Sequence, residues 1–237
     1  MRKSIIILVM LLALHVVSAL GQSTAHHRLS NLPHIYIETL TGAEVVSKEE
    51  QLYCRLWMVD ENDKEEKYDS VLIRCRGNST LKLEKKPYRI KFNDDKSHHM
   101  LKDSPLQSPA KCKKWTLINN YGDKTLMRNL LAFDISKRVG MEYTPYGRLV
   151  DVIFNGEYKG TYQLCDQVEV NKNRVNVEEM DEKCISGEEL TGGYLVEIDA
   201  YAEGEDNYFW SKRRNPVTIK YPDSDDILQV QTDYISN

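Results

Sequence analysis

The order of apolar and polar positions along the chain predicts a series of short strands in its first half. Alternating or short apolar runs are typical of strands, and they occur at residues 34–39, 51–59, 70–76, 87–92 and 114–119. A charged loop at 60–69 joins the second and third runs, and a polar connection at 93–111 contains Pro105 and Pro109. These runs predict a sheet.

A helix and a hairpin follow. Residues 124–139 have the helical period, Asp123 is a suitable N-cap and Gly140 a suitable stop. Most apolar side chains of this helix share one broad arc, and Ile135 lies outside it, so we expect the helix to be covered on more than one side. Residues 148–154 and 157–164 flank Asn155-Gly156, which favours a type I′ hairpin. Extended segments are expected at 166–170, 194–198 and 217–221.

The two ends of the chain carry different signals. Arg2 and Lys3 precede an apolar stretch at 4–17, which predicts a signal peptide cleaved before Gln22 or after Ala19, with an uncleaved anchor as the alternative. We therefore expect an exported chain without a membrane span after signal removal. After Ser224, a candidate N-cap, a short helical pattern runs to the end of the chain. We expect this last helix to find little to pack on, and we interpret the chain as truncated.

Composition narrows the function classes only a little. The chain has 237 residues and a net charge of −4, which gives no electrostatic argument for nucleic acid or an anionic membrane. Its five cysteines are an odd set, and Cys54 and Cys75 lie on runs that could be neighbouring strands and pair. The sequence contains no C-x-x-C spacing that would predict a structural zinc site. We interpret His98-His99 as an exposed pair in a loop.

Dense polar motifs carry the strongest functional signal. They are Arg74-Cys75-Arg76-Gly77-Asn78-Ser79-Thr80, Lys85-Lys86-Pro87-Tyr88-Arg89-Ile90-Lys91-Phe92, residues 115–129, Asn155-Gly156-Glu157-Tyr158-Lys159-Gly160-Thr161-Tyr162 and Gly192-Gly193-Tyr194-Leu195-Val196-Glu197-Ile198-Asp199. Arg, Lys and Asn beside Gly can converge on phosphate oxygens. Together, over about 71–223, these segments resemble the spore-coat protein H (CotH) kinase family, and the chain is similar to the N-terminal portion of an exported bacterial member.

The resemblance implies a fold and a domain plan. It implies an α+β, atypical protein-kinase-like fold, in which an antiparallel sheet with one packed helix forms a small lobe. The order of strands, helix, hairpin and extended linker agrees with such a lobe, although other α+β domains share it. We expect a signal peptide at 1–21, a leader at 22–33, the small lobe at 34–165, and a hinge with the incomplete start of a large lobe at 166–237.

Several residues are candidates for binding the nucleotide. Arg76, Gly77, Asn78 and Ser79 follow a strand and can form a loop over phosphates, or simply a tight polar turn. Lys86 lies beside the next strand, where Arg89 and Lys91 share one face and Tyr88, Ile90 and Phe92 the other. That face either holds phosphates or is solvated. Lys114 competes with Lys91 for the role of phosphate-binding lysine.

The remaining candidates lie further along the chain. Arg128, near the start of the predicted helix, can reach a site beside the sheet or can be a boundary residue. Asp166 and Gln167 take the hinge position, where backbone groups can pair with an adenine edge or only connect two segments. Glu197 and Asp199 lie on one side of a strand and can bind Mg²⁺, although a surface pair is the favoured interpretation because Mg²⁺ needs more ligands.

The functional expectation follows from the resemblance. It implies transfer of phosphate from ATP, with Mg²⁺, to Ser or Thr of secreted or surface proteins. The sequence contains neither H-R-D-x-x-x-x-N nor D-F-G, and the family's Asn/Asp and Trp-Asp-x-Asp motifs lie beyond its last residue, so no catalytic residue is assigned and this chain alone is expected to be inactive. The alternative is a non-catalytic surface or adhesion module that binds protein or glycan. In either case we expect a periplasmic, cell-surface or extracellular location and no nucleic-acid partner.

Overall fold

The computed structural model describes residues 29–93 and 102–237. The predicted signal peptide, most of the leader and His98-His99 lie outside the described residues. The chain divides after Asn31, and every element named here belongs to the unit Leu32–Asn237.

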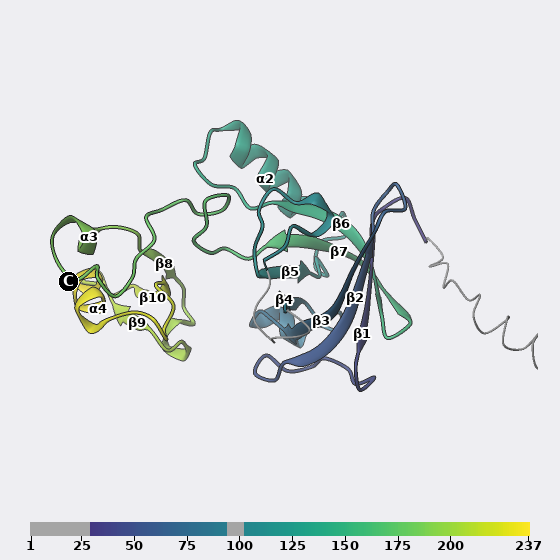
Figure 1. The fold of residues 1–237 in the computed structure, drawn as a ribbon, viewed down its shortest axis with the longest axis horizontal. Helices are drawn as coiled ribbons and strands as arrows, with labels where there is room; N and C mark the ends of the chain where they lie inside the picture. Colours follow the sequence, from purple (N-terminus) through teal and green to yellow (C-terminus); the bar gives the residue numbers. More distant parts are fainter. Residues whose placement is uncertain (1–28, 94–101) are drawn as a thin grey trace, which may run out of the picture. The chain divides into compact units, whose positions relative to one another are not determined.

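Seven strands close into a barrel in the order β1-β2-β3-β4-β5-β7-β6 (Figure 1). They are β1 (His34–Thr39), β2 (Leu52–Val59), β3 (Glu65–Cys75), β4 (Tyr88–Phe92), β5 (Lys114–Ile118), β6 (Gly147–Phe154) and β7 (Glu157–Asp166). Neighbouring strands are antiparallel except for the closing pair, in which β1 runs parallel to β6 with His34 opposite Asp151. Two 3₁₀ turns, η1 (Ser79–Lys82) and η2 (Pro105–Gln107), lie in the connections.

The core of the protein is the inside of this barrel. Because side chains alternate between the two faces of a strand, every second residue points inward. The buried inward side chains are almost all apolar and include Ile35, Ile37, Leu56, Met58, Val71, Ile73, Ile90, Phe92, Trp115, Leu117, Val150, Val152, Tyr162 and Leu164. The strand parity predicted for β4 is confirmed, since Tyr88, Ile90 and Phe92 are buried while Arg89 and Lys91 lie on the outer face.

The expected α+β, kinase-like lobe with one packed helix is wrong for this structure, which is mostly a closed barrel with few helices. Closure buries the apolar face of the sheet against itself, so no helix is needed to cover it. Helix α2 (Arg128–Arg138) lies outside the barrel beside β6 and buries no residue. Leu131 and Ile135 are 57% and 51% exposed, which contradicts the expectation that the helix is covered on more than one side.

Helix α2 also begins later than the sequence pattern predicts. Leu126 has a φ of 59°, in the left-handed region, so the backbone cannot be helical there. Asp123 still acts at the helix start, because its carboxylate accepts the amides of Thr125 and Arg128, each at 2.9 Å. The segment from 124 to 127 is therefore a turn that delivers the chain into α2.

The predicted hairpin is confirmed. Strands β6 and β7 pair across Asn155 and Gly156, whose φ values of 48° and 81° fit a type I′ turn. The Asn155 carboxamide also binds the end of β1, where it accepts the Thr39 amide at 3.0 Å and donates to Ala43 O at 3.3 Å. This side chain therefore helps to close the barrel.

A smaller sheet follows the barrel, in the order β8-β10-β9, made of β8 (Leu195–Ile198), β9 (Tyr208–Trp210) and β10 (Pro216–Tyr221). The short helix α3 (Gly187–Thr191) and the turn η3 (Ala202–Gly204) accompany it. Helix α4 (Gln229–Ser236) starts four residues later than expected, with Leu228 at its N-cap in place of Ser224. The expectation that it finds little to pack on is wrong, because buried Gln231 donates to Asp181 O and Cys184 O and Tyr234 stacks on Tyr194.

Two further observations bear on sequence expectations. Cys54 and Cys75 are both free thiols buried in the barrel, so the possible pairing between them is not formed. Among the described residues, none of the helices has the length and apolar character needed to cross a membrane.

Candidate functional site

A cluster of four cations covers the outer face of strands β3, β4 and β5. Arg74 lies directly opposite Arg89, and Lys91 directly opposite Lys114. Directly opposed side chains are about 5 Å apart at Cβ, so like charges repel there. We call Arg74, Arg89, Lys91 and Lys114 the cationic face.

The crowding of charge perturbs these groups. Burial, with repulsion from Arg74 and Arg76, lowers the pKa of Arg89 to about 10, so the side chain is still charged at neutral pH. Burial, with repulsion from Arg89 and Lys114, lowers the pKa of Lys91 as well. The buried Nε of Arg89 has no hydrogen-bond partner among the described residues. The cationic face therefore holds positive charge that the protein itself does not fully neutralise.

Two adjoining cavities lie along the segment that follows β7, residues 167–171, which we call the connector, and the first of them borders the cationic face. The first, of about 260 Å³, is lined by Arg89, Lys114, Gln167 and Glu169, and the chain after β8 adds Lys220 and the acids Glu205, Asp206, Asp223 and Asp225. The second, of about 430 Å³, is lined by Arg76, Thr116, Asp166, Gln167 and Glu197. Six of the residues singled out from the sequence (Arg76, Arg89, Lys114, Asp166, Gln167 and Glu197) thus meet along the connector.

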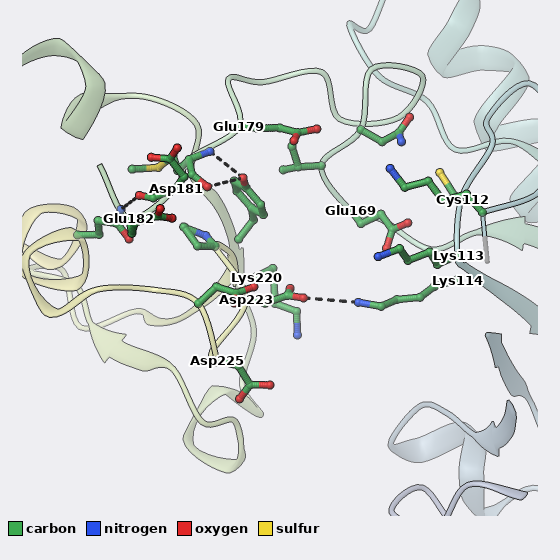
Figure 2. A pocket seen from close by; sticks show the side chains of 18 residues that line it. Cys112, Lys113, Lys114, Glu169, Glu179, Asp181, Glu182, Lys220, Asp223 and Asp225 are labelled. Carbon is green, nitrogen blue, oxygen red and sulfur yellow. Dashed lines mark hydrogen bonds and ion pairs between the residues drawn. The ribbon is translucent and has the colours of Figure 1, made fainter. Parts of the chain in front are cut away.

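A larger cavity of about 570 Å³ continues from the first, and Figure 2 shows it. Lys113 and Lys114 come from the start of β5, and Lys114 reaches Asp223 at 3.7 Å. Acids outnumber lysines around this cavity, with Glu179, Asp181 and Glu182 on the side away from β5. Among the described residues, no arginine lines this larger cavity.

The connector is held by an arginine that sequence reasoning missed. The side chain of Arg174 is fully buried, and its Nη1 donates to Lys114 O at 3.0 Å, Gln167 O at 2.9 Å and Glu169 Oε1 at 2.8 Å. Its Nε lies 3.3 Å from Asp166 Oδ1, close enough for an ion pair but not aligned as a hydrogen bond. The guanidinium stacks on Trp115, 4.5 Å from the ring centroid. No local pattern marks a lone Arg in a polar segment as buried.

Burial also affects the carboxyl partners of Arg174. Burial raises the pKa of Asp166, against the opposing effects of the Tyr146 amide and Arg174. Burial likewise raises the pKa of Glu169, against Arg174 and Lys114. Desolvation therefore outweighs pairing for both groups.

Other candidates from the sequence lie apart from these cavities. Asn78 Oδ1 accepts from Lys48 Nζ at 2.8 Å, and exposed Ser79 opens η1. Lys86 Nζ donates to Leu81 O and Leu83 O, each at 2.8 Å, and so caps that turn. Arg128 is exposed and pairs with Asp123 at 3.5 Å. None of the four lines the cavities along the connector.

Gly77 serves the same turn through its backbone. Its φ is 82°, and a Cβ there would lie 2.2 Å from Thr80 Oγ1. Glycine therefore fits the tight-turn interpretation of this loop.

The two proposed metal ligands are not arranged as a cation site. Glu197 pairs with Lys220 at 3.6 Å, and Asp199 accepts the Tyr201 amide of its own turn. Within the described parts of the chain, no group of three or more His, Cys, Asp or Glu side chains gathers as metal ligands would. Two carboxylates supply too few oxygen ligands for Mg²⁺.

The Asn-rich motif at 119–129 has a structural role. Asn119 donates to Lys85 O at 2.5 Å, and buried Asn120 donates to Leu126 O at 3.2 Å. Asn129 in turn donates to Asn120 Oδ1 at 2.9 Å. These amides hold the left-handed turn at Leu126 and so fix where α2 begins.

Comparison with known proteins gives one result. The family model described as CotH kinase protein matches residues 73–237, which is more than half of the chain. No curated protein matches the sequence.

Proposed function

This chain belongs to the CotH kinase protein family, and we propose that its cationic face and connector bind ATP for the transfer of a phosphoryl group to Ser or Thr of exported proteins. The phosphates lie against Arg89, Lys91 and Lys114, and the adenine edge meets the connector near Asp166 and Gln167. Arg76 lines the second of the two cavities.

One observation carries the proposal: like charges face each other across neighbouring strands, and the nearby acids Glu169 and Asp223 offset their repulsion only in part. Each directly opposed cation pair costs a few tenths to about 1 kcal/mol relative to neutral side chains. A bound polyphosphate offsets that cost and supplies acceptors for charge-assisted hydrogen bonds, which are about twice as strong as neutral ones. The buried Arg89 Nε is a donor that has no acceptor among the described residues.

The proposal is limited to nucleotide recognition by this chain's own residues. Glu197 and Asp199 do not fit a Mg²⁺ site, for the reasons of geometry given above. In the family's reaction, Mg²⁺ would neutralise charge on the phosphates. The side chains described here can bind and orient the nucleotide.

A non-catalytic binding module is the second candidate, and a different cavity favours it. A pocket of about 410 Å³ at one end of the barrel is lined by several tyrosines, among them Tyr88, Tyr121, Tyr158 and Tyr162. Aromatic-lined pockets with polar rims are common ligand sites at barrel mouths. This alternative places protein or glycan there and needs no nucleotide.

Calorimetry with ATP separates the two candidates. Replacing Arg89 and Lys91 with Ala should weaken ATP binding by about 1–3 kcal/mol, which is the scale of lost charge-assisted hydrogen bonds. The control replaces Lys137 and Arg138, two exposed cations at the end of α2, and should leave the affinity unchanged. Equal affinity in wild type and the Arg89/Lys91 variant rejects the assignment, and no ATP binding by wild type favours the binding module.

A further inference from the structure

Arg174 touches more separate parts of the proposed site than any one candidate residue does. Its contacts join the last residue of β7, the connector and the first residue of β5, through Asp166, Gln167 and Lys114. Yet Arg174 itself lines none of the cavities described along the connector. It can therefore act on a ligand only through the groups it holds.

We propose that Arg174 is a positioning residue that fixes the connector against β5 and thereby shapes the nucleotide cavity. This inference rests on the proposed function for its ligand, but the geometry of the connector can be tested without one.

The local backbone explains how Arg174 arrives there. The chain turns back after the connector, with the Arg174 amide donating to Asn171 O at 2.9 Å and the Asn171 amide to Val175 O at 3.0 Å. Asn171 Oδ1 accepts the Asn173 amide, which tightens the same turn. The returning strand segment thus directs Arg174 underneath the connector and over Trp115.

Stability alone does not account for this arrangement. Burying one cation with two carboxylates costs desolvation energy that an apolar side chain would avoid. What guanidinium adds is geometry, because its planar fork holds several acceptors in fixed directions and its face stacks on an aromatic ring. Lysine keeps the charge but lacks both the fork and the stacking face. Comparing the Arg and Lys variants at position 174 therefore separates the effect of positioning from the effect of charge.

The test compares Arg174→Lys with a matched Arg138→Lys control. Arg138 is exposed and makes one ion pair, with Asp134 on its own helix. Each protein is titrated with ATP and, separately, with inorganic tripolyphosphate, at a temperature well below every melting point. Hydrogen exchange is followed at the Asn171 and Val175 amides, with the β6–β7 hairpin as internal reference. Trp115 fluorescence reports the loss of the stacked guanidinium.

Arg174→Lys should weaken ATP binding about tenfold, the scale of one or two lost charge-assisted hydrogen bonds. Tripolyphosphate, which needs only the cationic face, should change less than about twofold, because Arg174 contacts that face only at the Lys114 carbonyl, and β4 and β7 already hold β5 on both sides. The Asn171 and Val175 amides should exchange faster while the hairpin does not. The Arg138→Lys control should match wild type throughout.

Three results overturn the proposal. Wild-type ATP affinity in Arg174→Lys shows that the residue does not shape the cavity, and equal weakening of ATP and tripolyphosphate shows a general loss of structure. If wild type binds neither probe, the proposed function fails, and hydrogen exchange alone decides whether Arg174 positions the connector. Unchanged exchange rates at Asn171 and Val175 in Arg174→Lys then overturn the proposal. Faster rates confined to the connector support it. Arg174→Met, which removes the cation beside buried Asp166, tests the same amides if it folds.

Discussion

Replacing Gly193 with Ala should disrupt the small sheet that follows the barrel, whereas the same change at Gly192 should not. Gly193 has a φ of 66°, and a Cβ there would lie 2.0 Å from the carbonyl oxygen of Glu178. Gly192 has a φ of −89°, and its Cβ would lie 3.7 Å from the nearest atom, an ordinary contact. The two neighbouring glycines thus form a matched pair.

The expected magnitude follows from these contacts. A left-handed conformation costs a non-glycine residue about 1–2 kcal/mol. The obstructing atom belongs to the backbone, so the segment around Glu178 has to move. That movement strains the two hydrogen bonds between Met180 and the Tyr221 hydroxyl, at 2.7 and 3.2 Å, each with a net value of about 1 kcal/mol. The total is about 3 kcal/mol for Gly193→Ala, against a slight stabilisation at Gly192.

Hydrogen exchange followed by mass spectrometry suits this prediction, because the effect is local rather than global. In Gly193→Ala, amides near Met180 and in β8 should exchange roughly a hundredfold faster, since about 1.4 kcal/mol corresponds to a factor of ten. The β6–β7 hairpin should keep its wild-type rates in both variants. Indistinguishable exchange in Gly193→Ala and Gly192→Ala would refute the reasoning.

Three further predictions concern other parts of the chain. Asn155→Ala should lower the free energy of unfolding by about 1–3 kcal/mol, because the Thr39 amide and its neighbours lose their partner; urea denaturation measures this, and an unchanged midpoint contradicts it. At pH 8, a maleimide should modify half-buried Cys184 well before Cys54, since burial raises the pKa of Cys54 to about 12; peptide mass spectrometry showing equal labelling would contradict the burial. Because the pKa of Lys91 is lowered, its protonated form is lost earlier as pH rises, so ATP affinity should already fall below the ordinary lysine pKa of about 10.4; calorimetry showing constant affinity from neutral pH up to that value would exclude Lys91 as a phosphate ligand.

Features that depend on neighbours in the sequence could be predicted, and features set by distant contacts could not. The Asn155-Gly156 turn and the parity of β4 follow from local chemistry and from the period of a strand. Closure of the barrel depends on the parallel pairing of β1 with β6, which no local pattern encodes. The prediction that helix α2 is covered on more than one side failed for the same reason. An open sheet needs a helix packed on its apolar face, whereas the closed barrel encloses that face itself.

The candidate site shows the same division. Strand parity placed Arg89 and Lys91 on one outer face, but the register that sets Arg74 opposite Arg89 required the structure. Asn78 and Lys86 belong to dense polar motifs, yet their side chains stabilise turns. Arg174 escaped notice because its burial depends on Trp115 and on carboxylates from separate segments.

The parallel pairing of β1 with β6 affects when the protein can fold. Thr39 and Asn155, which meet at the seam, are 116 residues apart in the chain. Contacts this distant in sequence form slowly, and during synthesis the first strand has to wait for the sixth. Until then β1 to β5 can pair only as an open sheet, whose apolar face is not yet enclosed by the barrel. If the chain is exported, as the signal peptide predicted at 1–21 implies, this delay leaves the barrel open during transport across the membrane, and the barrel closes afterwards.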